Sequence, residues 1–347
     1  MDNEIKYSFC EKNLMILPFI SLKREPEKII QREWKMINDE IANIKVVGGQ
    51  YGVPQIFELD VLLALFNIAF KNSNNSFANI SNTITFTYQE LSEEVGYSQY
   101  SGKVKFLLER SIEKINETTI YNNKNSFFNA KLNKYTHGFG DGISCRIFKN
   151  YCSYKEKGCQ KQIVVIDDSF MDNIKNNYYS SYDYEKYKNL KSSIAKRLYL
   201  MIAALEMDQS KFLTYQTLAD YLILDYSKPT KKRYTTHLIN KAIEELVEAN
   251  IIKSFERDRG KGVNIYFKDP ISDYIWRELS KLQISWEELI WLTQNTSKKY
   301  LVGVLKYINY KQIVKKEKIK NIKKYFLSAF NFYNKKDFKK WNIDKFL

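Results

Sequence analysis

The side chains best suited to specific recognition lie close together, in the stretch SKPTKKRYTTHLINKAIEE (227–245). Four of them recur at the i, i+3, i+4 and i+7 spacing of a single helix face: Arg233, Thr236, His237 and Asn240. Arginine and asparagine can each make two parallel hydrogen bonds to a base edge, to guanine and adenine respectively. The spacing therefore predicts a helix that reads bases in a DNA groove.

Cations and polar groups surround this face and suit phosphate, which a helix N-terminus also favours. They are Lys228, Lys231, Lys232, Thr235 and Lys241, followed by Arg257, Arg259 and Lys261 in a hairpin that turns at Gly260 and Gly262. The alternative is a solvated helix end beside an ordinary hairpin, because acids also lie nearby. These acids are Glu244, Glu245, Glu256 and Asp258.

Residues for catalysis are missing from the chain. The stretch GYSQYSGKV (96–104) has one residue too many for a phosphate-binding loop, and Val104 stands where a hydroxyl is required. The two histidines, His137 and His237, lie far apart in the sequence, so a metal-dependent nicking site is not expected. Cys145, Cys152 and Cys159 recur every seven residues but lack CxxC spacing. We therefore predict a binding protein with no catalytic site, metal or cofactor.

The elements that position these residues occur twice. TYQEL (87–91) and TYQTL (214–218) each follow an apolar helix, at 57–70 and 192–206, and a short strand. Thr87 and Thr214 suit helix N-caps, and Glu90 completes a capping box in the first copy. Third helices are expected at 102–116 and 234–252. The second of these should bury Leu238, Ala242, Ile243, Leu246 and Val247.

Strand-like residues around a turn follow each third helix, at 118–132 and 251–267. This order predicts an α+β, helix-rich fold of two tandem winged helix-turn-helix domains. In the first copy, the groove and wing candidates are Ser98, Gln99, Ser101, Lys103, Lys105 and Lys124. Its third helix is nearly neutral, so a dimerisation or docking role fits the first copy equally well.

Charge and length define the remaining organisation. The net charge of +15 over 347 residues favours a polyanionic partner, and residues 271–347 alone hold 17 basic and 7 acidic side chains. We expect an N-terminal winged-helix domain at 1–165 with an extension at 1–50, the main DNA reader at 166–270, and a basic helical region at 271–347. No apolar run approaches the roughly 18 residues that a membrane-spanning helix needs, and no signal peptide is evident. A cytoplasmic protein without a membrane partner is therefore expected.

The last region interleaves lysines with aromatic side chains over 314–341. That composition suits single-stranded nucleic acid, where bases stack on rings. An amphipathic helix packed on its own domain is the simpler alternative, and binding at a membrane surface is a third.

Several stretches together resemble plasmid replication initiator proteins of the RepA type. They are LMILPFISLKR (14–24), YGVPQIFELDVLLALFNIA (51–69), the stretch 84–123 that begins ITFTYQELSEEV, and SSIAKRLYLMIAALE (192–206). The motif at 57–60 reads Phe57-Glu58-Leu59-Asp60 and keeps only one of the family's usual two aspartates, Asp60. IKNIKKYFLSAF (319–330) is similar to the family's tail, with Ile322 in place of a proline.

The resemblance implies two tandem winged helices that bind repeated double-stranded sites, or iterons, at a plasmid origin. It also implies opening of adjacent AT-rich DNA, recruitment of the host initiator and replicative helicase, and a homodimer in some states. Two other hypotheses remain open at this point. One is a transcriptional regulator or DNA-binding accessory protein, and the other is an adaptor whose winged helices contact proteins.

Overall fold

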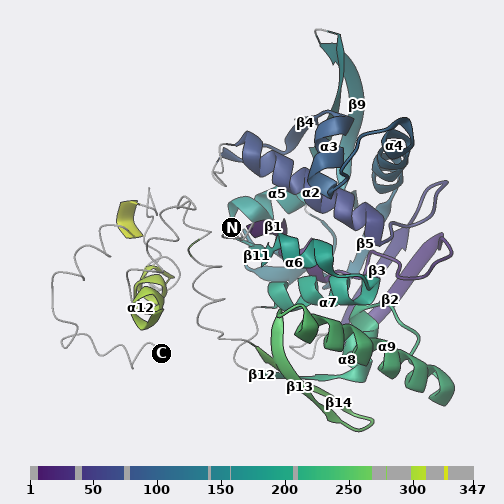
Figure 1. Cartoon of the computed structure of the whole chain (residues 1–347), viewed down its shortest axis with the longest axis vertical. Coiled ribbons are helices and arrows are strands. Elements are labelled where there is room, and N and C mark those ends of the chain that lie inside the picture. The colour runs from purple at the N-terminus through teal and green to yellow at the C-terminus, as the bar shows by residue number, and fades with distance from the viewer. Residues whose placement is uncertain are drawn as a thin grey trace. The chain divides into compact units, whose positions relative to one another are not determined.

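The computed structural model describes residues 7–35, 41–73, 79–139, 142–156, 158–205, 210–267, 279, 298–309 and 324–326. The chain divides into two compact units, Met1–Phe267 and Lys268–Leu347. Helices and antiparallel sheets share the first unit (Figure 1), so the α+β, helix-rich prediction is confirmed at that level. All described residues of the predicted winged-helix segments, 1–165 and 166–270, lie within this unit.

The first repeat begins with a largely buried helix, and two shorter helices follow a strand. These elements are α2 (Ile56–Asn72), β4 (Thr83–Phe86), α3 (Tyr88–Val95) and α4 (Gly102–Asn116). A long hairpin, β9 (Phe148–Glu156) and β10 (Cys159–Ile166), then pairs with β4 in the strand order β4-β10-β9. In Figure 1 this hairpin extends away from the helices at the top of the view.

The predicted position of the first wing, 118–132, is wrong. An insertion follows α4, made of β5 (Thr119–Lys124), β6 (Phe127–Asn129), β7 (Lys134–Thr136) and β8 (Ser144–Arg146). Strand β5 pairs with β8 and with β3 (Ile41–Val47), which itself pairs with β2 (Ile29–Lys35). Strands β6 and β7 pair only with each other. These strands therefore form separate sheets, and the hairpin beside β4 comes later in the chain.

The second repeat has the same order without an insertion. Its elements are α7 (Ser193–Ala204), β12 (Ser210–Thr214), α8 (Tyr215–Tyr221), α9 (Pro229–Glu248), β13 (Ile252–Asp258) and β14 (Gly262–Phe267). The strand order β12-β14-β13 matches that of the first repeat. Gly260 turns the hairpin with a φ of +76°, a value that favours glycine.

Short elements join the two repeats. They are β1 (Tyr7–Glu11), α1 (Lys12–Ile16), α5 (Asp168–Lys175), β11 (Tyr179–Asp183) and α6 (Tyr184–Asn189). Strand β1 pairs with β11 in antiparallel register. Asp60 of α2 accepts hydrogen bonds from Tyr187 (2.7 Å) and Lys196 (2.8 Å), so the aspartate of the motif at 57–60 ties the first repeat to the second.

Thr87 and Thr214 cap the second helix of each repeat, as predicted. The Thr87 hydroxyl accepts from the Glu90 amide (3.1 Å), and the Glu90 carboxylate accepts from the Thr87 amide (3.4 Å). The Thr214 hydroxyl accepts from the Thr217 amide (3.0 Å). Helix α3 ends at Gly96, whose φ of +109° is strained for other residues.

Removal of the first cap should have a measurable cost. Thr87→Ala leaves amides of the first turn of α3 without their acceptor, so the free energy of unfolding should fall by about 0.5–2 kcal/mol. Urea denaturation followed by fluorescence measures this change, and Thr214→Ala serves as the matched cap in the second repeat. An unchanged denaturation midpoint for both variants would contradict the capping assignment.

A buried carboxylate joins the N-terminal strand to the insertion and to α5. Glu11 accepts hydrogen bonds from Asn13 (2.7 Å), Asn173 (2.7 Å) and the Leu14 amide (2.9 Å). Both asparagines also donate to the carbonyl of Phe128 (2.9 and 2.8 Å). Burial raises the pKa of Glu11 to about 8, although these donors oppose the shift.

This pKa has a consequence for stability. An acid whose pKa is higher in the folded state binds more protons there, so the stability that it contributes is complete below the unfolded pKa near 4.5 and is lost as pH rises through about 8. Between pH 5 and pH 8, the unfolding free energy of the natural chain should fall relative to that of Glu11→Gln. Denaturant titrations at several pH values measure this difference, and parallel pH profiles for the two proteins would contradict it.

The second compact unit contains helix α12 (Lys298–Asn309), whose buried side chains include Leu301, Leu305 and Ile308. Phe326 is also buried, and Lys324 beside it is exposed. The remainder of the lysine and aromatic segment at 314–341, for which single-strand binding and packing on its own domain were the alternatives, lies outside the described residues. Among the residues that the structure does describe, no helix has the length and hydropathy needed to cross a bilayer.

Candidate nucleic-acid interface

Helix α9 begins earlier than its predicted start at 234. Pro229 occupies the first helical position, where its fixed φ and missing amide are tolerated, and Lys228 is the N-cap residue. Lys231, Lys232 and Arg233 therefore lie within the first two turns rather than before the helix, and all three are exposed. Lys232 also lies 5.2 Å from the ring centre of Tyr226. The helix N-terminus and these cations favour a phosphate contact.

The outer face of α9 agrees with the predicted reading face in most positions. Arg233, His237 and Lys241 are exposed, and Thr236 and Asn240 are half-buried. Thr235 corrects the prediction, because it is buried and its hydroxyl donates to the Asp225 carbonyl (2.6 Å).

Of the predicted core residues of α9, Ala242, Ile243 and Leu246 are buried, and the difference lies at the two ends of the stripe. Ile239 fills the core position expected for Leu238, while Leu238 and Val247 are only half-buried. The side of α9 that faces the core therefore includes Thr235 and Ile239, and Leu238 lies at its edge.

A second-repeat tyrosine orients Asn240. The hydroxyl of Tyr215, a buried residue of the repeated TYQ sequence, donates to the Asn240 Oδ1 atom (2.9 Å). The carbonyl oxygen keeps a second lone pair, and both protons of the side-chain amide remain for another acceptor. Asn240 is therefore held in a conformation from which it can still both accept from and donate to an adenine edge.

The β13–β14 hairpin holds its three predicted cations in different surroundings. Arg257 makes an ion pair with Glu244 of α9 and lies 5.4 Å from the ring centre of Phe255. Lys261 is 3.7 Å from Asp258, but both side chains are well exposed. Arg259 is exposed near the turn. Arg259 and Lys261 are thus better placed for phosphate than Arg257, whose charge is already partly neutralised.

Exposed aromatic side chains near both third helices were not predicted. Tyr234 on α9 is 61% exposed and adjoins Arg233 in a lysine-rich stretch of the sequence. Phe106 on α4 is also 61% exposed, and Tyr100, just before that helix, is 43% exposed. The inward spacing of Val104, Leu108 and Ile112 is the sequence signal that places Phe106 on the outside.

The candidate residues of the first repeat lie in two different places in the structure. Ser98, Gln99 and Ser101 are exposed before α4 or at its start, where Lys103 is exposed and Lys105 half-buried. Ser101 also caps α4 by accepting from the Val104 amide (3.3 Å). Lys124 instead lies at the end of β5, paired with Asn43, so it belongs to the four-stranded sheet rather than to a wing.

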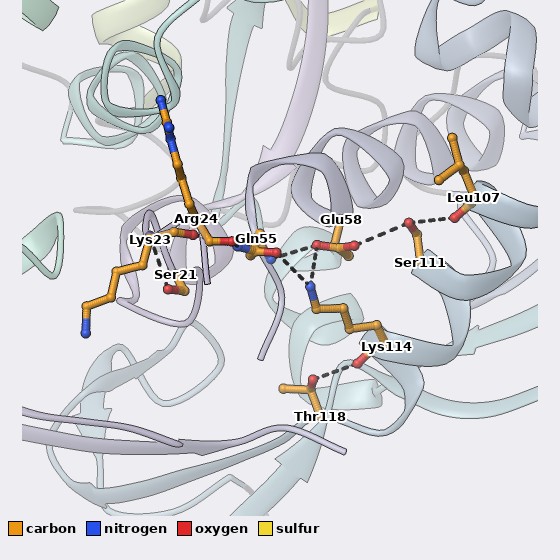
Figure 2. A network of polar contacts seen from close by, with 9 residues as sticks. All are labelled: Ser21, Lys23, Arg24, Gln55, Glu58, Leu107, Ser111, Lys114 and Thr118. Atoms are coloured by element: carbon orange, nitrogen blue, oxygen red, sulfur yellow. Dashed lines mark hydrogen bonds and ion pairs between the residues drawn. The ribbon is translucent and has the colours of Figure 1, made fainter. Parts of the chain in front are cut away.

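A buried polar network anchors α4, as Figure 2 shows. Lys114 donates to Glu58 (3.1 Å) and to Gln55 (3.2 Å), and Ser111 donates to Glu58 (3.4 Å). The Gln55 amide group reaches the carbonyl of Lys23 (2.6 Å), in the loop that follows the LMILPF stretch. Lys114 has the sequence surroundings of a surface charge, but it lies in the core. Lys114 therefore cannot contact a ligand, whereas Lys103 and Arg110 of the same helix are exposed.

Clusters with metal-ligand chemistry do not occur in the described part of the chain, where no three histidine, cysteine or acidic side chains converge. Cys145 is buried, and Cys152 and Cys159 are exposed on the β9–β10 hairpin. Their regular spacing in the sequence has no structural counterpart, because they lie on three different strands.

Comparison with known proteins identifies a family to which this sequence is similar. Residues 10–218 match the family model of replication initiator protein A. A comparison with curated proteins gives no match.

Among solved structures, domains 2 and 3 of RctB share 13% identity, with a TM-score of 0.49 over 74% of this chain and 98% of that chain. The Pi initiator protein in complex with iteron DNA shares 10% identity, with a TM-score of 0.45 over 77% and 99%. The family match covers more than half of the sequence and includes most of the stretches that carry the resemblance. The chain therefore belongs to the replication initiator protein A family.

Proposed function

We propose that this chain is a plasmid replication initiator in which two winged helix-turn-helix units bind repeated duplex sites at an origin. The observation that carries the proposal is the outer face of α9, where Arg233, His237 and Lys241 are all exposed. The chain that presents this face belongs to the replication initiator protein A family. Asn240, fixed by Tyr215, adds a second hydrogen-bonding group suited to a base edge. The β13–β14 hairpin supplies phosphate contacts beside it.

The same proposal extends to the first unit, with α4 entering a second groove segment and the β9–β10 hairpin acting as its wing. Lys155 is exposed on that hairpin, and Lys161 is half-buried and makes an ion pair with Glu156 (3.1 Å). Initiation on this scheme needs only binding energy, because bent DNA touches more of the protein surface, and this offsets the cost of unpairing adjacent AT-rich steps. We further propose that the bound complex recruits the host initiator and replicative helicase, and that the protein acts in the cytoplasm without enzymatic activity.

A binding titration tests the proposal. Fragments that tile the parent replicon are titrated with protein in excess random duplex between 50 and 200 mM salt. Tight binding should be confined to a fragment with direct repeats, and affinity should fall steeply with salt because each phosphate contact releases counterions. Uniform weak binding to all fragments would refute the proposal and favour an adaptor role. A transcriptional regulator would bind one fragment but leave its AT-rich DNA closed to single-strand probes.

A further inference from the structure

Corresponding positions of the two repeats are separated by the same number of residues, from the strand before the TYQ sequence into the third helix. Thr87 and Thr214 cap α3 and α8, and the third helices begin at Gly102 and Pro229, so both pairs are separated by 127 positions. Each residue of the first half of α4 therefore has a defined counterpart on α9.

Burial supports this correspondence. The core positions Leu108, Ile112 and Ile115 of α4 match Thr235, Ile239 and Ala242 of α9, and all six are buried. The two helices therefore turn the same side toward their own cores. Their outer faces can be compared position by position.

At the counterpart of Arg233, α4 carries Phe106. Both side chains are exposed, and Phe106 leaves 61% of its surface in contact with solvent. A large aromatic ring on an outer helix face has an energetic cost in water, which a ligand would remove by covering it. The position that holds Arg233, a side chain suited to guanine, in the second unit thus holds the apolar Phe106 in the first.

The surroundings of Phe106 favour duplex DNA as the ligand. Lys103 is exposed one turn earlier, Lys105 adjoins Phe106, and Ser98 and Gln99 precede the helix. Among the acids of this region, Glu109 lies at the midpoint of α4, Glu113 in its second half and Glu117 just beyond its end. Cations therefore flank the exposed ring at the end of the helix that would meet phosphates.

In the major groove, the C5-methyl group of thymine is the apolar feature among hydrogen-bonding base edges. A phenylalanine cannot donate or accept hydrogen bonds, so the thymine methyl group is the feature that it can recognise. We propose that Phe106 contacts a thymine methyl group in each bound site, so that the first unit selects an A·T pair while the second reads hydrogen bonds. This inference rests on the proposed function.

Deoxyuridine provides the test, because it lacks only the methyl group and keeps the base pairing of thymine. On the fragment bound most tightly, thymines are replaced one at a time, and affinity is measured for the natural chain and for Phe106→Ala. The natural protein should lose about fourfold affinity at one position per site, as expected for a buried methyl group. Phe106→Ala should bind the natural fragment more weakly and show no further loss at that position.

Leu132→Ala is the matched control, because Leu132 is a 56% exposed apolar side chain between β6 and β7 and belongs to neither third helix. It should keep the affinity and the deoxyuridine response of the natural chain. If Phe106→Ala retains the full response, or if no position responds in the natural chain, the contact is refuted while the initiator function stands. If no fragment is preferred over random duplex, both proposals fail.

Discussion

Replacement of Arg197 by alanine should lower the free energy of unfolding by about 3–5 kcal/mol, among the largest losses that one substitution can cause here. The guanidinium is fully buried and donates to the carbonyls of Leu14 (3.2 Å) and Leu17. It also lies 5.7 Å from the ring centre of Phe19. Alanine would leave a cavity and two buried carbonyls without donors, and it would release the N-terminal segment from α7.

Burial lowers the pKa of Arg197 to about 10, so the group stays charged at neutral pH. Arg197→Lys keeps the charge but has no planar fork to span two carbonyls, so its loss should be intermediate. Arg259→Ala removes an exposed arginine and should change stability by less than about 0.5 kcal/mol. Urea denaturation of the three variants measures the series. A loss for Arg197→Ala no larger than that for Arg259→Ala would contradict the structural role.

The largest functional effect is expected from Arg233→Ala. If Arg233 makes paired hydrogen bonds to a guanine, its removal should cost about 1–3 kcal/mol on the specific site, and discrimination should relax at a single base position. Competition assays against fragments with every base at each position of the site measure both quantities.

Lys261→Ala is the matched control for a phosphate contact, because its side chain is 75% exposed on the hairpin. It should weaken binding to all sequences alike and reduce the slope of log affinity against log salt by about one. Equal losses on specific and random duplex for Arg233→Ala would instead make Arg233 a second phosphate contact. The base-reading face would then have to be assigned to His237 and Asn240.

Local features of the fold could be predicted from the sequence because they depend on neighbours in the chain. The threonine caps, the stop at Gly96 and the turn at Gly260 each follow from one or two residues and their backbone preferences. The repeated order of helices was also visible, since apolar spacing and caps recur together. The family resemblance is confirmed by the match over residues 10–218.

Features that depend on distant partners could not be predicted in the same way. Strand β5 follows α4 as a wing would, but β3, about 75 residues earlier, supplies its hydrogen-bonding edge. Lys114 resembles any surface lysine until Glu58, on another helix, is known to face it. Thr235 adjoins the reading face, and only the Asp225 carbonyl explains its burial.

In the candidate interface too, features within one element could be predicted and features that join two elements could not. The cluster on α9 was found because its residues share one helix, whereas the pairing of Arg257 with Glu244 joins two elements. Phe106 was missed because the predicted DNA contacts were all charged or polar side chains. Its outward position follows from the matching buried sides of α4 and α9.

The pairing of β1 with β11 sets an order on synthesis. Tyr7–Glu11 leaves the ribosome first, but its partner Tyr179–Asp183 is made roughly 170 residues later, and Arg197 later still. At roughly 5–20 residues per second, the N-terminal strand waits for roughly 10–30 seconds without its partner. The first repeat therefore completes its packing only when the start of the second has emerged, so a ribosome that stops before residue 180 releases a chain with an exposed strand edge and the aggregation hazard that such an edge carries.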